Sequence, residues 1–391
     1  MELREKIKAE IEEAMGTGDF LLRSADNVED RFGMQQRLAG EDTIRMFCNG
    51  IGNVNPLYRS VDYARNSIHG SLIAPPHFLH AIAWQGGTQK KPLDCISGGF
   101  YGGNQAEWFK TIREGDRFTV FTIPGEVKDI TREGTAFQFL HTTKTAYKNQ
   151  KNEIAGIFDS TSVMFVDNNK DGQAPEKRVR KAPEVRYWSE EEVEELYQLI
   201  GKEPIRGAEP RYWEDVNVGD QLPPTHHFFT PQQTIAFLSG CGKFEDWRFR
   251  MSETKGIASS GFEMRPNPKT GIPEFSDPWW HVFDSVAERE GMDRVFCPGR
   301  QLECWLGSLI TNWMGDAGFL KKMACQFRAL LFDGSRVICR GKIVNKYMEG
   351  EEHLVDLHVT LEDHDGVFAV PNCSATVVLP SKNMSHWQFL K

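Results

Sequence analysis

Two stretches of the chain share the same internal spacing, one in each half of the sequence. In each stretch one side chain, Tyr58 in the first and His281 in the second, stands six positions before an alanine. The same side chain stands eighteen positions before the start of an apolar helical pattern, at Pro76 in the first half and at Gly299 in the second. A repeated spacing of this kind indicates a duplicated unit. The sequence therefore predicts two similar halves, of which only one carries the histidine.

Composition limits the classes of protein to consider. A chain of 391 residues is long enough for two fused halves with a large core. Its net charge of −9 argues against a nucleic-acid-binding protein. The eight cysteines form no CxxC pair and no His/Cys cluster at zinc spacing, so we expect reduced thiols, no metal and a cytoplasmic location. No apolar run approaches the ~20 residues of a membrane-spanning helix, so no membrane contact is expected.

Each half is predicted to contain a short helix, a buried helix and a run of strands. The helices are expected at 41–50, 74–84, 230–239 and 301–313. The strands are expected at 106–112, 117–130, 136–147 and 153–166, and at 323–332, 336–347, 353–362 and 367–379. An antiparallel sheet that wraps a central helix is an α+β hot-dog layout, so the duplicated chain is predicted to be a double hot-dog.

The predicted domain boundaries follow the duplication. Residues 1–40 are read as a helical leader, 41–168 as the first half, 169–205 as a linker with a helix, and 206–391 as the second half. The second half carries an insertion at 243–276, which is expected to cover the substrate entrance with Trp247, Phe249 and Phe262. In the linker, the basic run from Lys177 to Lys181 is either a solvated segment or a contact with an anionic ligand.

The repeated stretches resemble the hydratase motif of the MaoC-like (R)-specific enoyl-CoA hydratases and acyl dehydratases of the double hot-dog type. That motif runs Asp-x-Asn-Pro-Leu-His, then five residues, then Ala. The first half reads Asn53-Val54-Asn55-Pro56-Leu57-Tyr58, with Asn for Asp and Tyr for His. The second half keeps the histidine, His281, while Trp279-Trp280 replace Pro-Leu and Ser276 holds the place of the aspartate. The resemblance extends from residue 42 to residue 380.

This resemblance implies an acyl-CoA hydratase/dehydratase that adds water reversibly to a 2-enoyl-CoA thioester. Coenzyme A would enter as part of the substrate, and no further cofactor is expected. His281 is the expected acid/base. Asp277 is the expected carboxylate that orients the water, with Asp284 as the alternative. The backbone N–H of Gly299, at a helix start, is expected to bind the thioester oxygen.

The first half is predicted to be non-catalytic and to house the acyl tail. Tyr58 replaces its histidine, and Pro75 and Pro76 at its helix start have no N–H to donate. Substrate contacts are expected from the two halves together, and the candidates are Tyr58, Asn53, Asn55, Trp280 and Arg300. Arg300, Arg328 and Arg340 are candidates for the phosphates of coenzyme A, or are ordinary solvated side chains.

Two alternative functions stay open at this point. One is a thioesterase, or a hydratase of an unusual acyl-CoA, on the same scaffold. The other is a non-catalytic acyl-CoA-binding or partner subunit. We also expect a homodimer, because two fused hot-dog sheets leave a free sheet edge.

Overall fold

A computed structural model of the chain describes residues 2–15, 21–24, 36–83, 96–133, 135, 137–166, 180–243, 264–275 and 278–383. Within these ranges no helix is both long and apolar enough to cross a bilayer. The expected cover residues Trp247, Phe249 and Phe262 lie outside the described ranges, as do Asp277 and residues 177–179 of the basic run.

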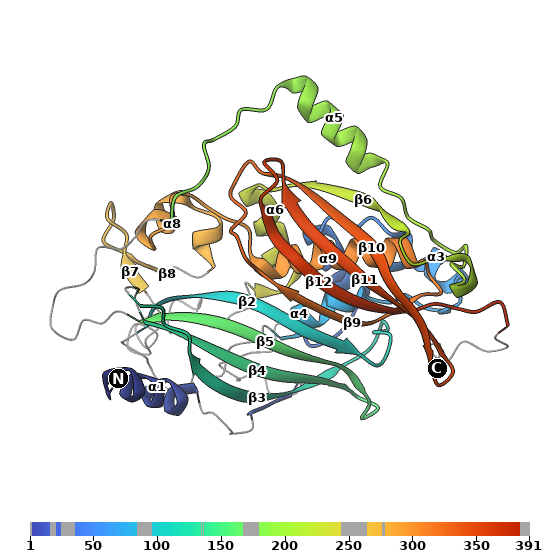
Figure 1. Cartoon of the computed structure of the whole chain (residues 1–391), viewed down its shortest axis with the longest axis horizontal. Coiled ribbons are helices and arrows are strands. Elements are labelled where there is room, and N and C mark those ends of the chain that lie inside the picture. The colour runs from blue at the N-terminus through green and yellow to red at the C-terminus, as the bar shows by residue number, and fades with distance from the viewer. Residues whose placement is uncertain are drawn as a thin grey trace.

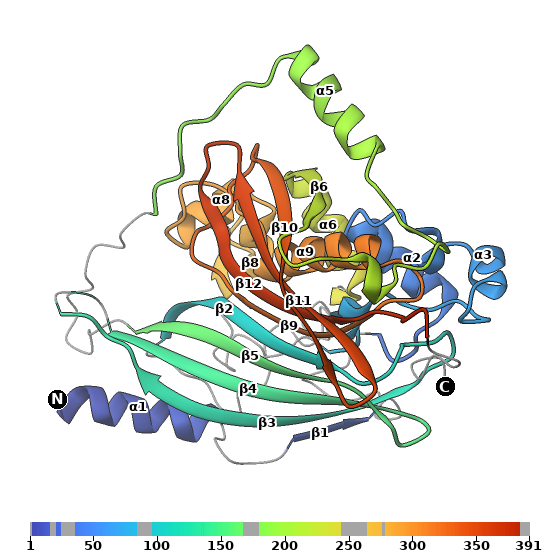
Figure 2. The ribbon, with the colours of Figure 1, turned by 45° about the vertical axis from the view of Figure 1, so that its right-hand side comes forward.

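One ten-stranded antiparallel sheet runs through both halves, in the order β1-β3-β4-β5-β2-β9-β12-β11-β10-β6. The first half supplies β1 (Leu21–Ser24), β2 (Ile96–Trp108), β3 (Phe118–Asp129), β4 (Phe137–Asn149) and β5 (Ile154–Val166). The second half supplies β6 (Gln221–Phe228), β9 (Phe319–Gln326), β10 (Arg336–Glu349), β11 (Glu352–Asp363) and β12 (Phe368–Val378). Figures 1 and 2 show the two half-sheets joined along β2 and β9. This arrangement confirms the predicted double hot-dog fold.

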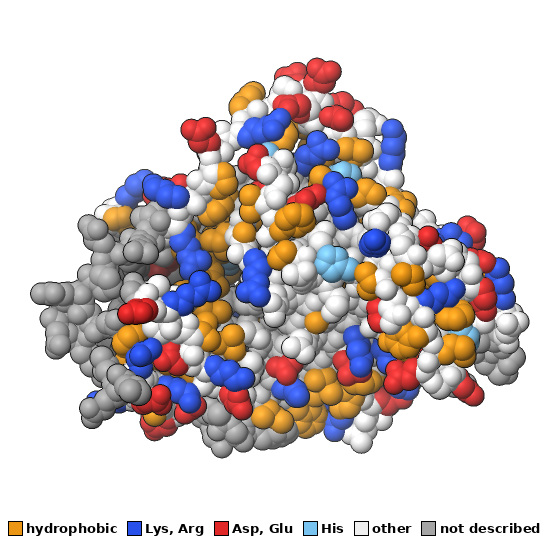
Figure 3. All heavy atoms as spheres, viewed as in Figure 1, with side chains coloured by type: hydrophobic (Ala, Val, Ile, Leu, Met, Phe, Trp, Pro, Cys, Tyr) orange, Lys and Arg blue, Asp and Glu red, His pale blue; other side chains and the backbone are white. Residues whose placement is uncertain are grey.

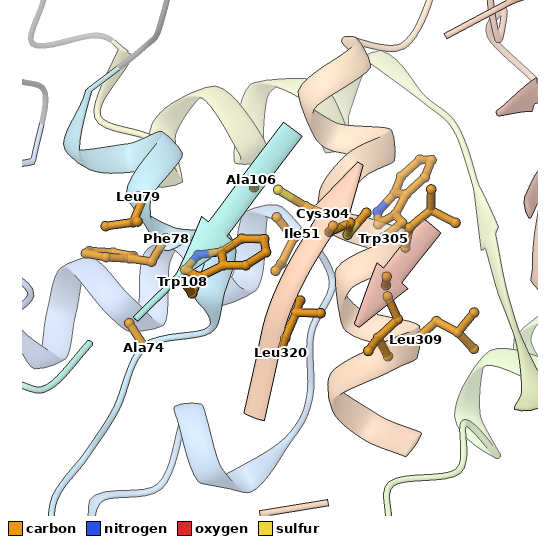
Figure 4. Close-up of a cluster of buried hydrophobic side chains, with 14 of the residues drawn as sticks. Ile51, Ala74, Phe78, Leu79, Ala106, Trp108, Cys304, Trp305, Leu309 and Leu320 are labelled. Atoms are coloured by element: carbon orange, nitrogen blue, oxygen red, sulfur yellow. The ribbon is translucent and has the colours of Figure 1, made fainter. Parts of the chain in front are cut away.

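The central helix of the second half is α9 (Gly299–Met314), which begins and ends as the sequence suggests. It starts at Gly299, and Gly315 follows it with a φ of 75°. All its side chains from Arg300 to Met314 are buried, as expected for a helix enclosed by a sheet. In the first half the corresponding segment is a 3-10 turn, η2 (Pro76–Phe78), which continues into α4 (Leu79–Ile82). Figure 4 shows Phe78 and Trp108 of the first half and Trp305 and Leu309 of α9 in one apolar cluster.

The duplication is visible where α2 (Glu41–Gly50) packs against α6 (Pro231–Gly240). A Cβ added at Gly50 would lie 2.7 Å from the Phe237 Cα, and one added at Gly240 would lie 2.8 Å from the Phe47 Cα. Each helix therefore presents a glycine to the other, and the two backbones approach closely. The remaining elements are the helices α1 (Glu2–Met15), α3 (Val61–Asn66), α5 (Glu190–Gly201) and α8 (Asp284–Arg289), the turns η1 (Pro56–Tyr58), η3 (Trp213–Asp215) and η7 (Trp279–His281), and the hairpin β7 (Met264–Pro266) and β8 (Pro273–Phe275).

Four elements differ from the sequence-based expectation. Strand β9 covers Phe319–Gln326 rather than residues 323–332. Within the predicted helical leader, residues 21–24 form strand β1, which pairs with β3. Strand β2 starts at Ile96 rather than at residue 106, and its ladder shifts register at Gly98 and Gly103. A Cβ at Gly103 would lie 2.4 Å from the Cys325 carbonyl oxygen across the β2–β9 seam, so glycine permits the close approach. Strand β6 was not expected, and it contains two prolines, Pro223 and Pro224.

Candidate functional site

His281 ends the turn η7 and lies beside the segment that leads into α9. Its Nδ1 is 2.8 Å from the Phe296 carbonyl oxygen. Its ring lies 4.5 Å from the Phe296 ring and 5.4 Å from the Trp280 ring. Because a carbonyl oxygen only accepts, Nδ1 carries a proton, and the neutral form of a ring bonded in this way has its lone pair on Nε2. This tautomer is the one that a general base at Nε2 requires.

Of the two candidate carboxylates, the structure describes Asp284 but not Asp277. Asp284 is the first residue of α8, and its Oδ1 accepts a hydrogen bond of 2.8 Å from the Val295 N–H. One of its oxygens therefore holds the loop before α9, three residues short of Pro298. Asp277, the first candidate for orienting the water, lies outside the described residues and stays a prediction.

Gly299 is the first residue of α9, with Pro298 as its N-cap. Among the described residues, nothing accepts a hydrogen bond from its backbone N–H. A Cβ at this position would lie 3.2 Å from Tyr101 Cδ1 and 3.3 Å from Phe327 Cε2, so glycine lets two rings pack on the helix start. An N–H at the start of a buried helix is suited to binding developing negative charge.

Arg300 and Trp280 also lie at this end of α9. The Arg300 guanidinium stands 4.1 Å over the Tyr101 ring, and only 8% of the residue is exposed. Trp280 stacks on Phe100, the neighbour of Tyr101 on β2, with centroids 5.8 Å apart and planes 10° apart. The structure therefore gathers His281, Trp280, Gly299 and Arg300 around one stretch of β2.

A buried carboxylate, Glu303, lies one turn further along α9. Its Oε1 accepts from Asn104 Nδ2 at 2.9 Å, and its Oε2 accepts from the Tyr101 hydroxyl at 3.1 Å. His80 Nε2 lies 3.3 Å from Oε2, and His77 Nε2 lies 3.7 Å from Oε1. Both histidines come from the first-half central helix, so this network joins the two halves through their cores. Sequence reasoning missed it, although an acidic residue inside an apolar helix was a usable signal.

The network stabilises the charged form of Glu303 in the core. Burial alone would raise the pKa of Glu303, but the His80 and His77 rings and the Asn104 amide hold the pKa at about 2. Burial lowers the pKa of His77 to about 4, although Glu303 opposes that effect. Glu303 is therefore ionised and His77 neutral near pH 7. The Tyr101 hydroxyl links this charge to the ring that packs on Gly299.

Asn53 and Asn55 lie at the other end of α9. Asn53 Nδ2 donates to Ser308 Oγ at 3.0 Å, and Asn55 Nδ2 donates to Asn312 Oδ1 at 3.1 Å. Asn312 is thirteen residues from Gly299, which is about 20 Å along a helix axis. The two asparagines are therefore separated from His281 and fasten the first-half motif to α9. Their predicted contact with substrate stays a prediction.

Tyr58 faces a small cavity of ≈ 30 Å³ between the first half and the end of α9. Pro76, Trp108, His69 and Asp316 also line the cavity. It has room for about two water molecules at ~10–15 Å³ each. The Asp316 carboxyl accepts from the Tyr63 hydroxyl at 2.8 Å through Oδ2. The housing of an acyl tail by the first half stays a prediction.

Among the described residues, one group brings three potential metal-binding atoms within 4.8 Å of one another: Asp363, His364 and Asp365. Asp363 Oδ1 already accepts from the N–H groups of Asp365 and Val367, both at 2.9 Å. This carboxylate therefore stabilises the turn between β11 and β12.

Comparison with known proteins gives one family match and several matches of fold. Residues 30–156 match the family model described as FAS1-like, dehydratase domain region. A "UPF0336 protein" of Streptomyces griseus is 31% identical over 96 residues, which are 23% of this chain and 63% of that protein. The chain thus spans less than two thirds of the length of this relative.

Solved structures match nearly the whole chain. A MaoC-like dehydratase superposes with a TM-score of 0.62 at 14% identity, over 94% of this chain and 98% of the other. The chain has the double hot-dog fold of the MaoC-like dehydratases. A putative MaoC domain dehydratase from Chloroflexus aurantiacus gives a TM-score of 0.56 at 12% identity, over 94% and 96% of the two chains. A conserved hypothetical protein from Mycobacterium tuberculosis, described as having a double hotdog fold, gives 0.52 at 9% identity, over 91% and 98%.

Proposed function

We propose that this MaoC-like chain is an acyl-CoA hydratase/dehydratase that adds water reversibly to a 2-enoyl-CoA thioester. The observation that carries the proposal is the pairing of a base with a donor at the start of α9. His281 is oriented by Phe296 so that Nε2 holds the lone pair. Gly299 offers an N–H to which the described residues supply no acceptor. These are the two groups that enolate chemistry needs.

In the hydration direction, His281 Nε2 takes a proton from water as the water oxygen bonds to the β-carbon of the enoyl group. The electron pair of the C=C bond moves toward the thioester oxygen, whose developing charge faces the Gly299 N–H. The imidazolium then returns its proton to the α-carbon. Asp277 is the proposed carboxylate that orients the water. The charge of Arg300 at the same helix start favours the enolate further.

The test is turnover of crotonyl-CoA and of a longer enoyl-CoA, followed by loss of the conjugated thioester absorbance together with a free-thiol assay. His281→Ala is expected to lower kcat by ~10²–10⁴-fold, the usual contribution of an acid/base. His358→Ala is the matched control, because His358 is an exposed histidine of β11 in the same half.

Each outcome separates the candidate functions. Loss of absorbance without thiol release supports hydration at this site if His281→Ala abolishes it and His358→Ala does not. Thiol release supports a thioesterase in its place. Unchanged substrate together with binding of acyl-CoA overturns catalysis and leaves the binding-subunit alternative.

A further inference from the structure

Arg180 belongs to the connector between the halves, and its backbone pairs with the loop that precedes α9. The Arg180 N–H donates to the Gly291 carbonyl at 2.9 Å, and the Asp293 N–H donates to the Arg180 carbonyl at 3.1 Å. These two bonds form an isolated parallel β-bridge in which Arg180 lies opposite Met292. The backbone of Arg180 is therefore fixed, although it lies in a linker.

The side chain of Arg180 stands on two aromatic rings. Its guanidinium carbon lies 4.3 Å over the Phe100 ring and 5.1 Å over the Phe165 ring. Stacking of this kind holds the planar guanidinium in one place while its edge stays available for hydrogen bonds. The residue as a whole is exposed to solvent.

This cation has no counter-charge among the described residues. The ion pairs found there do not include Arg180, and burial against the rings is the sole cause that lowers its pKa. Two neighbouring basic side chains of the connector each have an acidic partner. Lys181 pairs with Asp293 at 3.4 Å, and Arg186 pairs with Glu192 at 2.6 Å. A charge that is partly withdrawn from water and left uncompensated favours the binding of an anion.

Arg180 lies at the rim of the candidate active site. Trp280, the residue next to His281, stacks on the same Phe100 ring that carries the guanidinium. Phe100 also contacts Phe296, whose carbonyl orients His281. Figure 3 shows Lys and Arg side chains gathered along the hollow between the upper and lower parts of this face. An anion held by Arg180 would therefore be connected to His281 through the Phe100 ring and the residues that pack on it, Trp280 and Phe296.

We propose that Arg180 binds a phosphate group of coenzyme A and so anchors the carrier of the acyl substrate. This inference rests on the proposed function and names a contact that recognises the substrate. The phosphates of coenzyme A lie at the far end of the pantetheine arm from the thioester, so a phosphate site belongs at the rim and not beside His281. A guanidinium binds phosphate through two parallel hydrogen bonds, which gives both charge and orientation.

Among the arginines considered from sequence, Arg340 is a poorer candidate for this role. Its Nε lies 2.9 Å from Glu362 Oε1 on the neighbouring strand, so its charge is already compensated. Arg300 is buried with its guanidinium over the Tyr101 ring, and it lies at the start of α9 close to the reacting end. Arg328 is exposed and donates to Gln326.

The experiment compares Arg180→Gln with the wild-type chain on two thioesters of the same enoyl group, one of coenzyme A and one of pantetheine, which has no phosphate. Arg180→Gln is expected to raise KM for the coenzyme A thioester ~10–100-fold, the range for loss of a hydrogen bond to a charged group. Its kcat, and both constants for the pantetheine thioester, are expected to stay at wild-type values. Arg180→Lys is expected to raise KM less than Arg180→Gln does, since lysine keeps the charge but cannot form two parallel hydrogen bonds.

Lys181→Gln is the matched control, because Lys181 is the next residue and its charge is already paired with Asp293. It is expected to leave KM unchanged for both thioesters. An equal rise in KM for Lys181→Gln and Arg180→Gln would overturn the proposal, because it would indicate a general effect of surface charge. A KM for Arg180→Gln that matches the wild type would also overturn it.

Direct binding of coenzyme A and of dephospho-coenzyme A by calorimetry separates this proposal from the proposed function. If no enoyl thioester is turned over, yet coenzyme A binds and Arg180→Gln weakens it at least tenfold, the phosphate contact stands and the hydratase assignment fails. If turnover is normal and binding is insensitive to Arg180→Gln, the hydratase assignment stands and the phosphate contact fails. An effect of Arg180→Gln only on a carrier-protein thioester overturns the assignment to coenzyme A.

Discussion

Replacing Glu303 with glutamine tests whether the two halves are held by a buried charge. The carboxylate is 1% exposed and accepts hydrogen bonds from Asn104 and Tyr101, with His80 Nε2 3.3 Å away. Glutamine keeps the shape but turns one acceptor oxygen into an NH₂ group. That group must face one of the donors that the carboxylate now satisfies.

The expected loss follows from these contacts. A hydrogen bond to a charged group is worth ~1.5–3 kcal/mol, and removing one partner of a buried charged network typically costs ~3–5 kcal/mol. We therefore expect Glu303→Gln to lower the free energy of unfolding by about 3–5 kcal/mol. Glu107→Gln is the control. Glu107 pairs with Lys322 directly across the β2–β9 seam at 3.4 Å, but with 38% and 56% of the two side chains exposed.

Such an exposed pair is worth about 0–1 kcal/mol. The assay is urea denaturation followed by tryptophan fluorescence, with the change in free energy taken from the shift in midpoint at constant slope. Equal, small losses in the two variants would refute the reasoning, since they would mean that Glu303 carries no more energy than a surface ion pair. A large loss in both would show that charge across the seam matters regardless of burial.

Two further predictions concern acid stability and the start of α9. Burial lowers the pKa of His77 and of His141 to about 4, so the folded state keeps both rings neutral while the unfolded chain takes up protons near pH 6.5. Stability is then full above pH 6.5 and is lost as the pH falls toward 4; a melting temperature that stays level down to about pH 4.5 would contradict this. At the helix start, Gly299→Pro removes the N–H at a position where proline is tolerated and is expected to lower kcat ~10²–10³-fold. Gly299→Ala adds the same Cβ but keeps the N–H, so equal kinetics for the two variants would exclude a role for this donor.

The fold was predictable because its signals are local and repeated. The eighteen-residue spacing from His281 to Gly299 placed the start of α9 at the correct residue. The helix expected in the linker is α5, which begins with a local capping box in which the Ser189 hydroxyl accepts from the Glu192 N–H. Both features depend on residues within a few turns of each other, so a sequence contains them in full.

Strand β6 was missed because its two prolines argue against a strand in the interior of a sheet. The structure places β6 at the end of the strand order, where an edge strand tolerates residues that cannot donate to a ladder. Sequence does not state which strand is at the edge, because that depends on how distant segments pair.

The Glu303 network was missed for a related reason. His77 and His80 are more than two hundred positions from Glu303, and each alone looks like an ordinary side chain of a buried helix. Their meeting depends on how two helices cross, which the closeness of His77 to Gly307 shows: a Cβ at Gly307 would lie 2.3 Å from the His77 ring. The repeated spacing located the start of α9 but gave no information on which residues contact the middle of this helix.

The seam between β2 and β9 has a consequence for how the two halves can change. A pair of identical subunits repeats every substitution in both members, because one gene encodes them. Here the halves are one polypeptide, so their association does not depend on concentration and each can vary by itself. One helix start carries Gly299 while the other carries Pro75 and Pro76, and the pair of histidines that meets Glu303 comes from the first half. Covalent joining therefore lets the two copies carry different residues at equivalent positions.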